Sequence, residues 1–554
     1  MKRVLIIGGM AAGCKTAARV KRINPDYDVT IIEQRSFISF GACGMPLFAA
    51  GDVDDFFDLA KTPFGIVRDE EYFSKVKDVN VLLNTKVTKI DPDKKTITIK
   101  NNNNSEDSFL EYDELVIATG AKPLKPPFKC PDSENISTFH HPLDAKRFRE
   151  KAQKGLIESA VIIGGGLIGC ELAEALVSLW GIETTLVERE NRLLPGCLDE
   201  ELSPVLEKYF RNNDVNIKLS TTVEKVELGE DGNPIVFTNG GEEFHADCLF
   251  LCLGVKPVVS LASEAGIRLG QSGGIATDGQ LRTNIPNIWA GGDCIEIKNL
   301  ITSELSIMPL GSLANRQGRV IANSIAGKED SFKGAVGAMS MKVFDLITCS
   351  TGLSEHTALK LGYDAVSVTG CWYDRPDYHP DHKSLFAKLV FDKSSHKILG
   401  AQMIGEGEIT RYIDTLTEML KNNADIRQLI DAEHCYMPAH SSPMNPLNGL
   451  GSMAESLIFD DINCMKCSKS DDFTGLVLDV REDSEVEANP YPFPSIRIPL
   501  KGFRKKVVEL RKEASVLIVC QKGPRAYDVA KYMKNIGFSD VSYLGGGCDL
   551  KLLL

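Results

Sequence analysis

Two segments of the chain repeat one pattern of hydrophobic and polar positions. Residues 4–34 and 159–189 each begin with a short apolar run, continue through a glycine-rich turn into an alanine-rich stretch, and end with a second apolar run closed by Glu. Apolar runs bounded by glycine are typical of buried strands, and the stretch between them has the composition of a helix. The pattern therefore predicts two βαβ units of a dinucleotide-binding fold.

The second unit carries the complete G-x-G-x-x-G spacing at Gly164, Gly166 and Gly169, with Glu188 about 20 residues further on. These glycines allow a tight turn, a close approach of backbone to pyrophosphate, and close packing of helix on strand. The acidic residue accepts hydrogen bonds from a ribose hydroxyl. We therefore expect a dinucleotide whose phosphates face the helix N-terminus.

The first unit has Gly8 and Gly13, and Glu33 stands at the corresponding acidic position, but Met10 replaces the middle glycine. Glycines in ordinary loops are the alternative explanation. Strand, helix and acidic residue are nevertheless in register in both units, which favours two dinucleotide sites.

The rest of the chain also divides by pattern. Strand-like runs lead into small-residue turns within 112–123, 246–257 and 283–296. Residues 330–455 mix strand-like and helix-like stretches, and a polar stretch around 460–472 precedes a compact α/β pattern. A chain of 554 residues is too long for one core, so we expect several domains.

Composition narrows the class of protein. The net charge of -13 disfavours general nucleic-acid binding, and no apolar run reaches the length of a membrane span. The N-terminal apolar run is short, which favours a buried strand over a signal peptide. Fifteen cysteines without framework spacing indicate reduced thiols and a cytoplasmic protein.

Cys43 has no cysteine at the C-x-x-C or C-x4-C spacing, because Pro46 and Phe48 occupy those positions. A helix beginning at Pro46 would place the thiol near a positive helix end, which favours the reactive thiolate. Any S–S bond there would join sulfur from outside the chain, as a mixed disulfide or persulfide, and sulfenic acid is a further possible state. A buried inert cysteine is the alternative.

The two units, the turn at Thr119-Gly120, the strand end at Gly292-Asp293 and Cys43 together resemble the two-dinucleotide flavoprotein disulfide reductases. The single cysteine is similar to that of the branch containing coenzyme A disulfide reductases and NADH oxidases. At the C-terminal end, 478–482 (LDVRE) and 520–526 (CQKGPRA) resemble a rhodanese domain. The whole chain resembles flavin reductases fused to rhodanese.

The resemblance implies an α/β protein with two Rossmann-like dinucleotide-binding domains, an α+β dimerisation domain and a C-terminal rhodanese-like α/β domain. We expect a homodimer. The expected boundaries are 1–150 and 251–328 for the FAD-binding domain, 151–250 for the NAD(P)-binding domain, 329–458 for the dimerisation domain, 459–472 for a linker, and 473–554 for the rhodanese domain.

The resemblance also implies FAD on the first unit and NADH or NADPH on the second, with coenzyme A as a further ligand or substrate. Glu188 favours NADH because a carboxylate repels a 2′-phosphate. The implied contacts are Gly8, Gly13, Glu33, Thr119, Gly120, Gly292 and Asp293 for FAD, and Gly164, Gly166, Gly169 and Glu188 for the nicotinamide dinucleotide.

Substrate contacts implied by the resemblance are Lys15, Arg19, Arg22 and Ser39, which match a basic coenzyme A site near the cysteine. A solvated helix face is an equally good explanation of the three basic residues. The chain departs from the family pattern at Ala42 and Met444. Tyr436 and Tyr378 match family tyrosines and could donate a proton to a leaving thiolate, or serve as interface aromatics.

Cys520 begins a loop that ends at Arg525, between an apolar strand and a helix. Backbone N–H groups of such a loop converge on the sulfur, and Lys522 and Arg525 add positive charge that stabilises a thiolate or persulfide. An inactive rhodanese-like module is the alternative. Cys464 and Cys467 form a lone C-x-x-C, interpreted as incidental, and we expect no metal site.

These features predict a flavoenzyme that uses NAD(P)H to reduce the S–S bond of a persulfide, polysulfide or coenzyme A disulfide at Cys43, with Cys520 as the sulfur carrier. An NADH oxidase or peroxide reductase cycling Cys43 through sulfenic acid is one alternative. A flavin-bound redox sensor is another.

Overall fold

The computed structural model describes residues 1–101, 107–492 and 494–554. Two compact units make up the chain. The first comprises Met1–Gly164, Leu172–Thr185 and Thr222–Ala335, and the second comprises Gly165–Glu171, Leu186–Thr221 and Val336–Leu554. Among the described residues, no helix combines the length and apolar character needed to cross a membrane.

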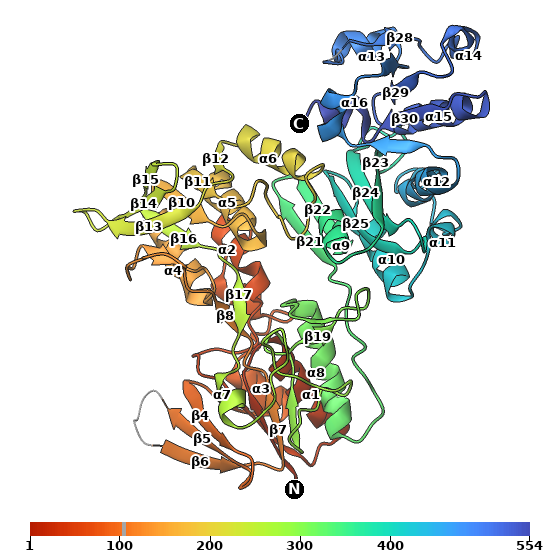
Figure 1. Cartoon of the computed structure of the whole chain (residues 1–554). Coiled ribbons are helices and arrows are strands. Elements are labelled where there is room, and N and C mark those ends of the chain that lie inside the picture. Colours follow the sequence, from red (N-terminus) through yellow and green to blue (C-terminus); the bar gives the residue numbers. More distant parts are fainter. Residues whose placement is uncertain (102–106, 493) are drawn as a thin grey trace. The chain divides into compact units, whose positions relative to one another are not determined.

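The first unit contains a five-stranded parallel sheet of order β18-β7-β1-β2-β3, of which Figure 1 labels β7. All four side chains of β7 are buried, which explains why such runs are continuously apolar and do not alternate. β18 pairs with β7 although it lies far along the sequence, so two distant parts of the chain build this domain. The strands are β1 (Arg3–Ile7), β2 (Asp28–Ile32), β3 (Asn80–Leu82), β7 (Glu114–Ile117) and β18 (Ile288–Ala290).

Helices α1 (Ala11–Ile23) and α8 (Gly311–Ile325) pack closely on one another. A Cβ atom at Gly318 would lie 2.7 Å from the Ala12 carbonyl oxygen and 2.9 Å from Lys15 Cβ, so this approach requires glycine. The packing fixes where α8 begins, which matters for the site described below.

The second dinucleotide-binding region has a five-stranded sheet of order β12-β11-β10-β16-β9. Its strands are β9 (Ile136–Ser137), β10 (Ser159–Ile163), β11 (Glu183–Val187), β12 (Val215–Lys218) and β16 (Cys248–Leu251), and its helices include α5 (Leu167–Ser178) and α6 (Ser203–Asn212). Each dinucleotide-binding region also carries a three-stranded antiparallel sheet, made of β4 (Thr85–Asp91), β5 (Thr96–Asn101) and β6 (Asp107–Glu111) in the first and of β13 (Val223–Leu228), β14 (Pro234–Thr238) and β15 (Glu243–His245) in the second.

The second unit contains an antiparallel sheet of order β21-β22-β25-β24-β23. Its strands are β21 (Met339–Val343), β22 (Leu346–Gly352), β23 (Ala365–Tyr373), β24 (Ser384–Asp392) and β25 (Ile398–Gly405). Helices α10 (Thr410–Lys421) and α12 (Pro446–Phe459) contact this sheet, and every side chain of β25 is buried.

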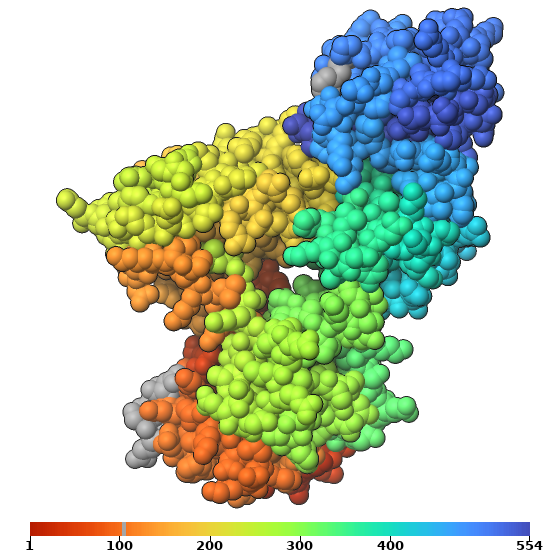
Figure 2. All heavy atoms as spheres, in the orientation of Figure 1, coloured from red at the N-terminus to blue at the C-terminus, as the bar shows by residue number. Residues whose placement is uncertain are grey.

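The C-terminal domain is a parallel sheet of order β26-β30-β29-β27-β28. Its strands are β26 (Asn463–Met465), β27 (Leu476–Asp479), β28 (Ile496–Arg497), β29 (Ser515–Val519) and β30 (Asp540–Leu544), and its helices include α13 (Asp483–Ala488), α15 (Pro524–Asn535) and α16 (Gly547–Lys551). Ser456 Oγ of α12 lies 3.0 Å from Tyr527 OH of α15, and Figure 2 shows the dark blue C-terminal domain against the paler α12 region.

The stretch 459–472, which its polar composition suggests is a linker, is structured instead. β26 pairs in parallel with β30 and so extends the C-terminal sheet, and a 3-10 helix follows at Cys467–Asp472. A short edge strand needs no continuous apolar run, so the sequence pattern conceals it.

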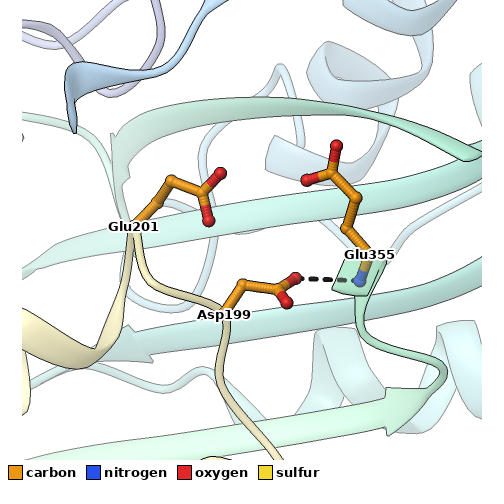
Figure 3. Close-up of side chains that lie close together, drawn as sticks. All are labelled: Asp199, Glu201 and Glu355. Atoms are coloured by element: carbon orange, nitrogen blue, oxygen red, sulfur yellow. Dashed lines mark hydrogen bonds between the residues drawn. The ribbon is translucent and has the colours of Figure 1, made fainter. Parts of the chain in front are cut away.

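A buried charge cluster ties the second unit together. The Lys388 ammonium, fully buried in β24, lies 3.0 Å from Asp199, 2.7 Å from Glu201 and 2.8 Å from Glu355. The three carboxylates point toward one another, and Glu355 N–H donates to Asp199 (Figure 3). Lys466, just after β26, adds bonds of 2.8 Å to Glu201 and 2.7 Å to Glu355.

The three acidic residues have the spacing of metal ligands, but the Lys388 ammonium binds all three. Although burial lowers the pKa of Lys388, the surrounding carboxylates outweigh it and raise that pKa. The cluster therefore joins a loop after β11, helix α9 (Glu355–Lys360), strand β24 and the entry to the C-terminal domain by ion pairs. Lys388 and the three carboxylates are buried, whereas the Lys466 side chain is partly exposed.

We predict that Lys388→Met lowers the free energy of unfolding by about 3–5 kcal/mol, because it removes the buried cation that three carboxylates share and leaves Glu201 and Glu355 only the partly exposed Lys466. Guanidinium denaturation measures the loss. Lys383→Met is the matched control, since the Lys383–Glu406 pair is half-exposed and should cost less than about 1 kcal/mol. Equal losses in the two variants would contradict the structural role of Lys388.

Candidate functional site

Cys43 lies in a 3-10 turn, Ala42–Gly44, immediately before helix α2 (Met45–Ala50), which has Pro46 in its first turn as the sequence predicts. The cysteine is exposed. A Cβ atom at Gly44 would lie 2.4 Å from Leu59 Cδ2, so the turn packs tightly on the segment around Leu59.

A second helix end adjoins Cys43 and escaped the sequence analysis. The Cys43 Sγ lies 3.9 Å from where a Cβ of Gly311 would stand, at the start of α8. The preceding residue, Leu310, has an apolar side chain that cannot cap the first N–H groups of this helix. An uncapped helix N-terminus stabilises a thiolate. The helical pattern that follows Pro309 is the signal in the sequence, but only packing brings it to Cys43.

The first glycine turn forms a tight cradle. A Cβ at Gly8 would lie 2.2 Å from the Ala118 carbonyl oxygen, and one at Gly13 would lie 1.9 Å from the Gly8 carbonyl oxygen. Met10 precedes α1, and its side chain cannot cap the helix, so the first N–H groups can face a phosphate. Glu33 is buried and accepts from Gly9 N at 2.7 Å and Arg35 N at 2.9 Å.

The other positions expected at FAD lie near this cradle or support it. The Thr119 hydroxyl donates to Val258 O at 2.7 Å, so it holds the turn in place. Gly120 and Gly292 both have positive φ, and Gly292 N donates to Gln317 at 2.6 Å. Burial raises the pKa of Asp293, and hydroxyl or N–H donors of a bound ligand would oppose that rise. This donor set fits the pyrophosphate and ribose of FAD.

The second glycine turn repeats this geometry. A Cβ at Gly164 would lie 2.3 Å from the Cys252 carbonyl oxygen, whereas the position of a Cβ at Gly166 is open space. Glu188 accepts from Gly165 N at 2.7 Å and Glu190 N at 2.8 Å, matching the bonds made by Glu33. Gly169 lies in the first turn of α5, at the position that the motif requires.

Of the four residues expected to contact coenzyme A, two are exposed and two make hydrogen bonds within the fold. Lys15 and Arg22 are exposed on α1, whereas Arg19 Nε donates to Asn323 Oδ1 of α8 at 2.9 Å. Ser39 has a φ of +53° and donates its backbone N–H to Gly9 O at 2.7 Å, so it supports the glycine turn.

Tyr378 and Tyr436 are brought together in the second unit. Both side chains are exposed, at 70% and 51% of their full area. Loss of hydration, a hydrogen bond with Tyr436 and the charge of Asp377 raise the pKa of Tyr378. Nearby, burial and the Arg411 charge lower the pKa of His434, whose buried Nε2 has no hydrogen-bond partner among the described residues. The Tyr378–Tyr436 pair and His434 are groups that can hold or move a proton.

Cys520 directly follows β29 and is fully buried in the predicted loop. Its Sγ accepts from Gly523 N at 3.1 Å and Ala526 N at 3.3 Å. Burial raises the pKa of the thiol, and these N–H groups and the Arg525 charge oppose that rise. Glu485, which the sequence analysis missed, binds Arg525 through both carboxylate oxygens, with one bond of 2.9 Å.

The Lys522 backbone N–H helps to lower the pKa of Cys520, but the ammonium of this residue is bound by other groups. Its ammonium pairs with Asp549 at 3.0 Å, bonds Ser384 Oγ at 3.0 Å and lies 4.1 Å from the Tyr373 ring centre. These partners hold the charge away from Cys520, so Arg525 is the side-chain cation at the sulfur.

Comparison with known proteins identifies the family. Residues 2–318 match the family described as pyridine nucleotide-disulphide oxidoreductase, and residues 339–446 match its dimerisation domain. The chain is 34% identical over 446 residues to "NAD(P)H sulfur oxidoreductase (CoA-dependent)" of Pyrococcus abyssi, covering 80% of this chain and 96% of that protein.

Two solved structures match nearly the whole chain. One is the NAD-dependent persulfide reductase from A. fulgidus, with a TM-score of 0.94, 35% identity and 99% of both chains covered. The other is reduced Bacillus anthracis CoADR-RHD, with a TM-score of 0.92, 32% identity, and coverage of 100% of this chain and 98% of that chain. The predicted fold class, including the rhodanese-like C-terminal domain, is confirmed. The chain belongs to the pyridine nucleotide-disulphide oxidoreductase family.

Proposed function

We propose that the protein uses NAD(P)H and FAD to reduce the S–S bond of a persulfide, polysulfide or coenzyme A disulfide at Cys43, while Cys520 carries sulfane sulfur. The observation that supports it most is the environment of the two sulfurs. Cys43 adjoins the uncapped start of α8, and Cys520 accepts two backbone N–H bonds beside Arg525. The start of α8 favours a thiolate at Cys43, and the N–H groups and the Arg525 charge oppose the rise that burial causes in the pKa of Cys520.

Two glycine cradles would hold the cofactors. The Gly8–Gly13 turn, Glu33 and Asp293 would hold FAD, and the Gly164–Gly169 turn and Glu188 would hold the nicotinamide dinucleotide. Bound FAD supplies the chemistry that converts a hydride into an electron pair at sulfur. NADH fits better than NADPH because the Glu188 carboxylate is fixed by two backbone N–H groups, and neighbouring Arg189 pairs with Glu190 at 3.0 Å.

The chain's own residues would bind the substrate and control its protons. Cys43 would hold the substrate sulfur in a mixed disulfide, and α8 would stabilise the thiolate that reduction releases. Tyr378 and Tyr436 would donate a proton to the departing thiol. Lys15, Arg19, Arg22 and Ser39 would bind an adenosine phosphate tail, although Arg19 and Ser39 also have the structural bonds described above.

The match of residues 339–446 to a dimerisation domain supports a homodimer. The absence of disulfide-framework spacing among the fifteen cysteines of the sequence is our reason for expecting a reducing compartment such as the cytosol. Coenzyme A persulfide is the acceptor that we would test first, because relatives and neighbours carry names that mention coenzyme A or persulfide.

We predict that Cys43→Ser retains reduction of bound flavin by NADH but loses at least about 100-fold in acceptor turnover, because it removes the covalent sulfur step. Anaerobic NADH consumption with coenzyme A persulfide, polysulfide and coenzyme A disulfide measures this. Cys130→Ser, a half-buried thiol elsewhere in the first unit, is the control. Unchanged turnover in Cys43→Ser would refute the assignment, and turnover with oxygen alone would favour the NADH oxidase alternative.

Glu188→Gln should raise the ratio of NADPH to NADH kcat/KM by about tenfold, because it removes the charge that opposes a 2′-phosphate. Steady-state kinetics with both nucleotides give the ratio. Glu183→Gln removes the same charge from an exposed position on β11 and should leave the ratio unchanged. The assignment fails if both variants behave alike.

Arg525→Ala should slow sulfur uptake by Cys520 by at least about tenfold and shift alkylation of this thiol to higher pH. The sign follows from charge: Arg525 lowers the pKa of Cys520, so its loss raises that pKa. Iodoacetamide labelling against pH measures the shift. Lys522→Ala should shift it less, because the Lys522 ammonium pairs with Asp549, and a larger shift in Lys522→Ala would contradict this assignment.

A further inference from the structure

Five cysteines gather around the turn Gly545–Gly547, which joins β30 to α16, and the proposed function uses only one of them. Cys464 Sγ lies 2.7 Å from where a Cβ of Gly545 would stand, and Cys467 Sγ donates to Gly545 O at 3.0 Å. The remaining three are Cys371, Cys520 and Cys548, and all are buried.

Cys548 and Cys520 are in direct backbone contact. Cys548 N donates to Cys520 O at 2.9 Å, and the next pair, Asp549 N to Gln521 O, repeats the bond at 2.9 Å. With standard bond lengths, the first hydrogen bond limits the two Cα atoms to at most about 6.8 Å apart. This limit does not exceed the largest Cα separation that a disulfide spans without backbone movement, about 6.8 Å.

The loop that holds the Cys520 sulfur packs against this turn. Gly523, whose N–H binds the sulfur, is packed against it, because a Cβ there would lie 3.3 Å from Gly546 N and 3.7 Å from Gly547 N. The wall of the Cys520 cradle and the start of α16 therefore touch. The charge of Cys520 is also among the causes that raise the pKa of Cys548, as expected for nearby thiols.

Cys548 is a protonated thiol at rest. Burial raises its pKa to about 12, although the Arg481 guanidinium opposes this rise. A small thiolate fraction makes it a slow nucleophile. A buried thiol fixed beside its target nevertheless reacts at a high effective concentration. Attack of Cys548 on a persulfide at Cys520 would thus be slower than sulfur transfer to a bound acceptor. It would become the main reaction of the persulfide when no acceptor is present.

We infer that Cys548 discharges a persulfide on Cys520 by forming a Cys520–Cys548 disulfide, an inference that rests on the proposed sulfur-carrier role of Cys520. The Cys548 thiol loses its proton to solvent and attacks Cys520 Sγ. The bond from this Sγ to the sulfane sulfur breaks, and the sulfane sulfur leaves with the electron pair as hydrosulfide. The sulfane sulfur is reduced, and the two cysteine sulfurs are oxidised.

The Cys520–Cys548 disulfide would keep Cys520 reversibly inactive. A dithiol reductant, which is itself oxidised to a disulfide, would return both cysteines to thiols by exchange. The pair would then act as a redox switch that stops sulfur uptake by the C-terminal domain until reducing equivalents return.

The test uses the full-length protein without oxygen or NAD(P)H, with thiosulfate as the sulfur donor and sulfite as the expected product of loading. After the thiosulfate is removed, the wild type should release hydrosulfide and give a Cys520–Cys548 linked peptide in mass spectrometry. Cys548→Ser should keep the Cys520 persulfide at least about tenfold longer. Cys371→Ser is the matched control, because Cys371 is also buried and its N–H donates to Lys522 O in the same loop, and it should behave as the wild type.

Persulfide lifetimes that are equal in the wild type and Cys548→Ser would overturn the inference and leave the sulfur-carrier role intact. Failure of both proteins to take up sulfur would overturn the carrier role, and the inference with it. Because Cys548→Ser could disturb a buried site, the linked peptide in the wild type is a second, independent measurement. Its absence after hydrosulfide release would also overturn the inference.

Discussion

Backbone N–H groups directed at carboxylate oxygens or at a cysteine sulfur organise the candidate sites of this chain. Gly9 and Gly165 donate to the buried carboxylates of Glu33 and Glu188, and Gly523 and Ala526 donate to the Cys520 sulfur. In each case a turn after a buried strand presents the backbone donors. Binding through these donors does not require a long side chain to lose water or conformational freedom. Such turns leave no room for a Cβ at key positions, and this requirement sets where glycine must occur.

Bonds from backbone N–H groups also explain why the first unit tolerates a departure from the dinucleotide motif. Met10 replaces the middle glycine of the first unit, yet Glu33 is held as firmly as Glu188, because its bonds come from Gly9 and Arg35. The two acidic side chains are thus fixed before any ribose arrives. A carboxylate that is already oriented loses little conformational freedom on binding, which favours affinity for the nucleotide.

The C-terminal loop depends on the neighbouring sheet. β23 is an edge strand, and its open edge bonds the Cys520 region, with Cys371 N donating to Lys522 O at 2.9 Å and Gly546 N donating to Thr369 O at 3.1 Å. Covering an edge removes unpaired backbone groups. The same contact between strand and loop places the Tyr373 ring against the Lys522 ammonium. Arg525, which pairs with Glu485, is therefore the side-chain cation at the Cys520 sulfur.

The order of strands, glycine turns and helices follows from the sequence, because each depends on residues close together in the chain. The two cradles, the solitary Cys43 and the loop from Cys520 to Arg525 could all be identified this way. The edge strand β26 could not be predicted from the sequence pattern, because a short strand at a sheet edge needs no apolar run and β26 lies in a polar stretch.

Tertiary structure alone decided which distant groups meet. The start of α8 comes to Cys43 because Gly318 lets that helix pack on α1, and no local pattern encodes this. Lys522 pairs with Asp549, and Cys548 lies beside Cys520, because strand pairing and the neighbouring sheet fix the loop that begins at Cys520. Charges and thiols act over a few ångströms, so their partners depend on the packing of the whole fold and not on spacing along the chain.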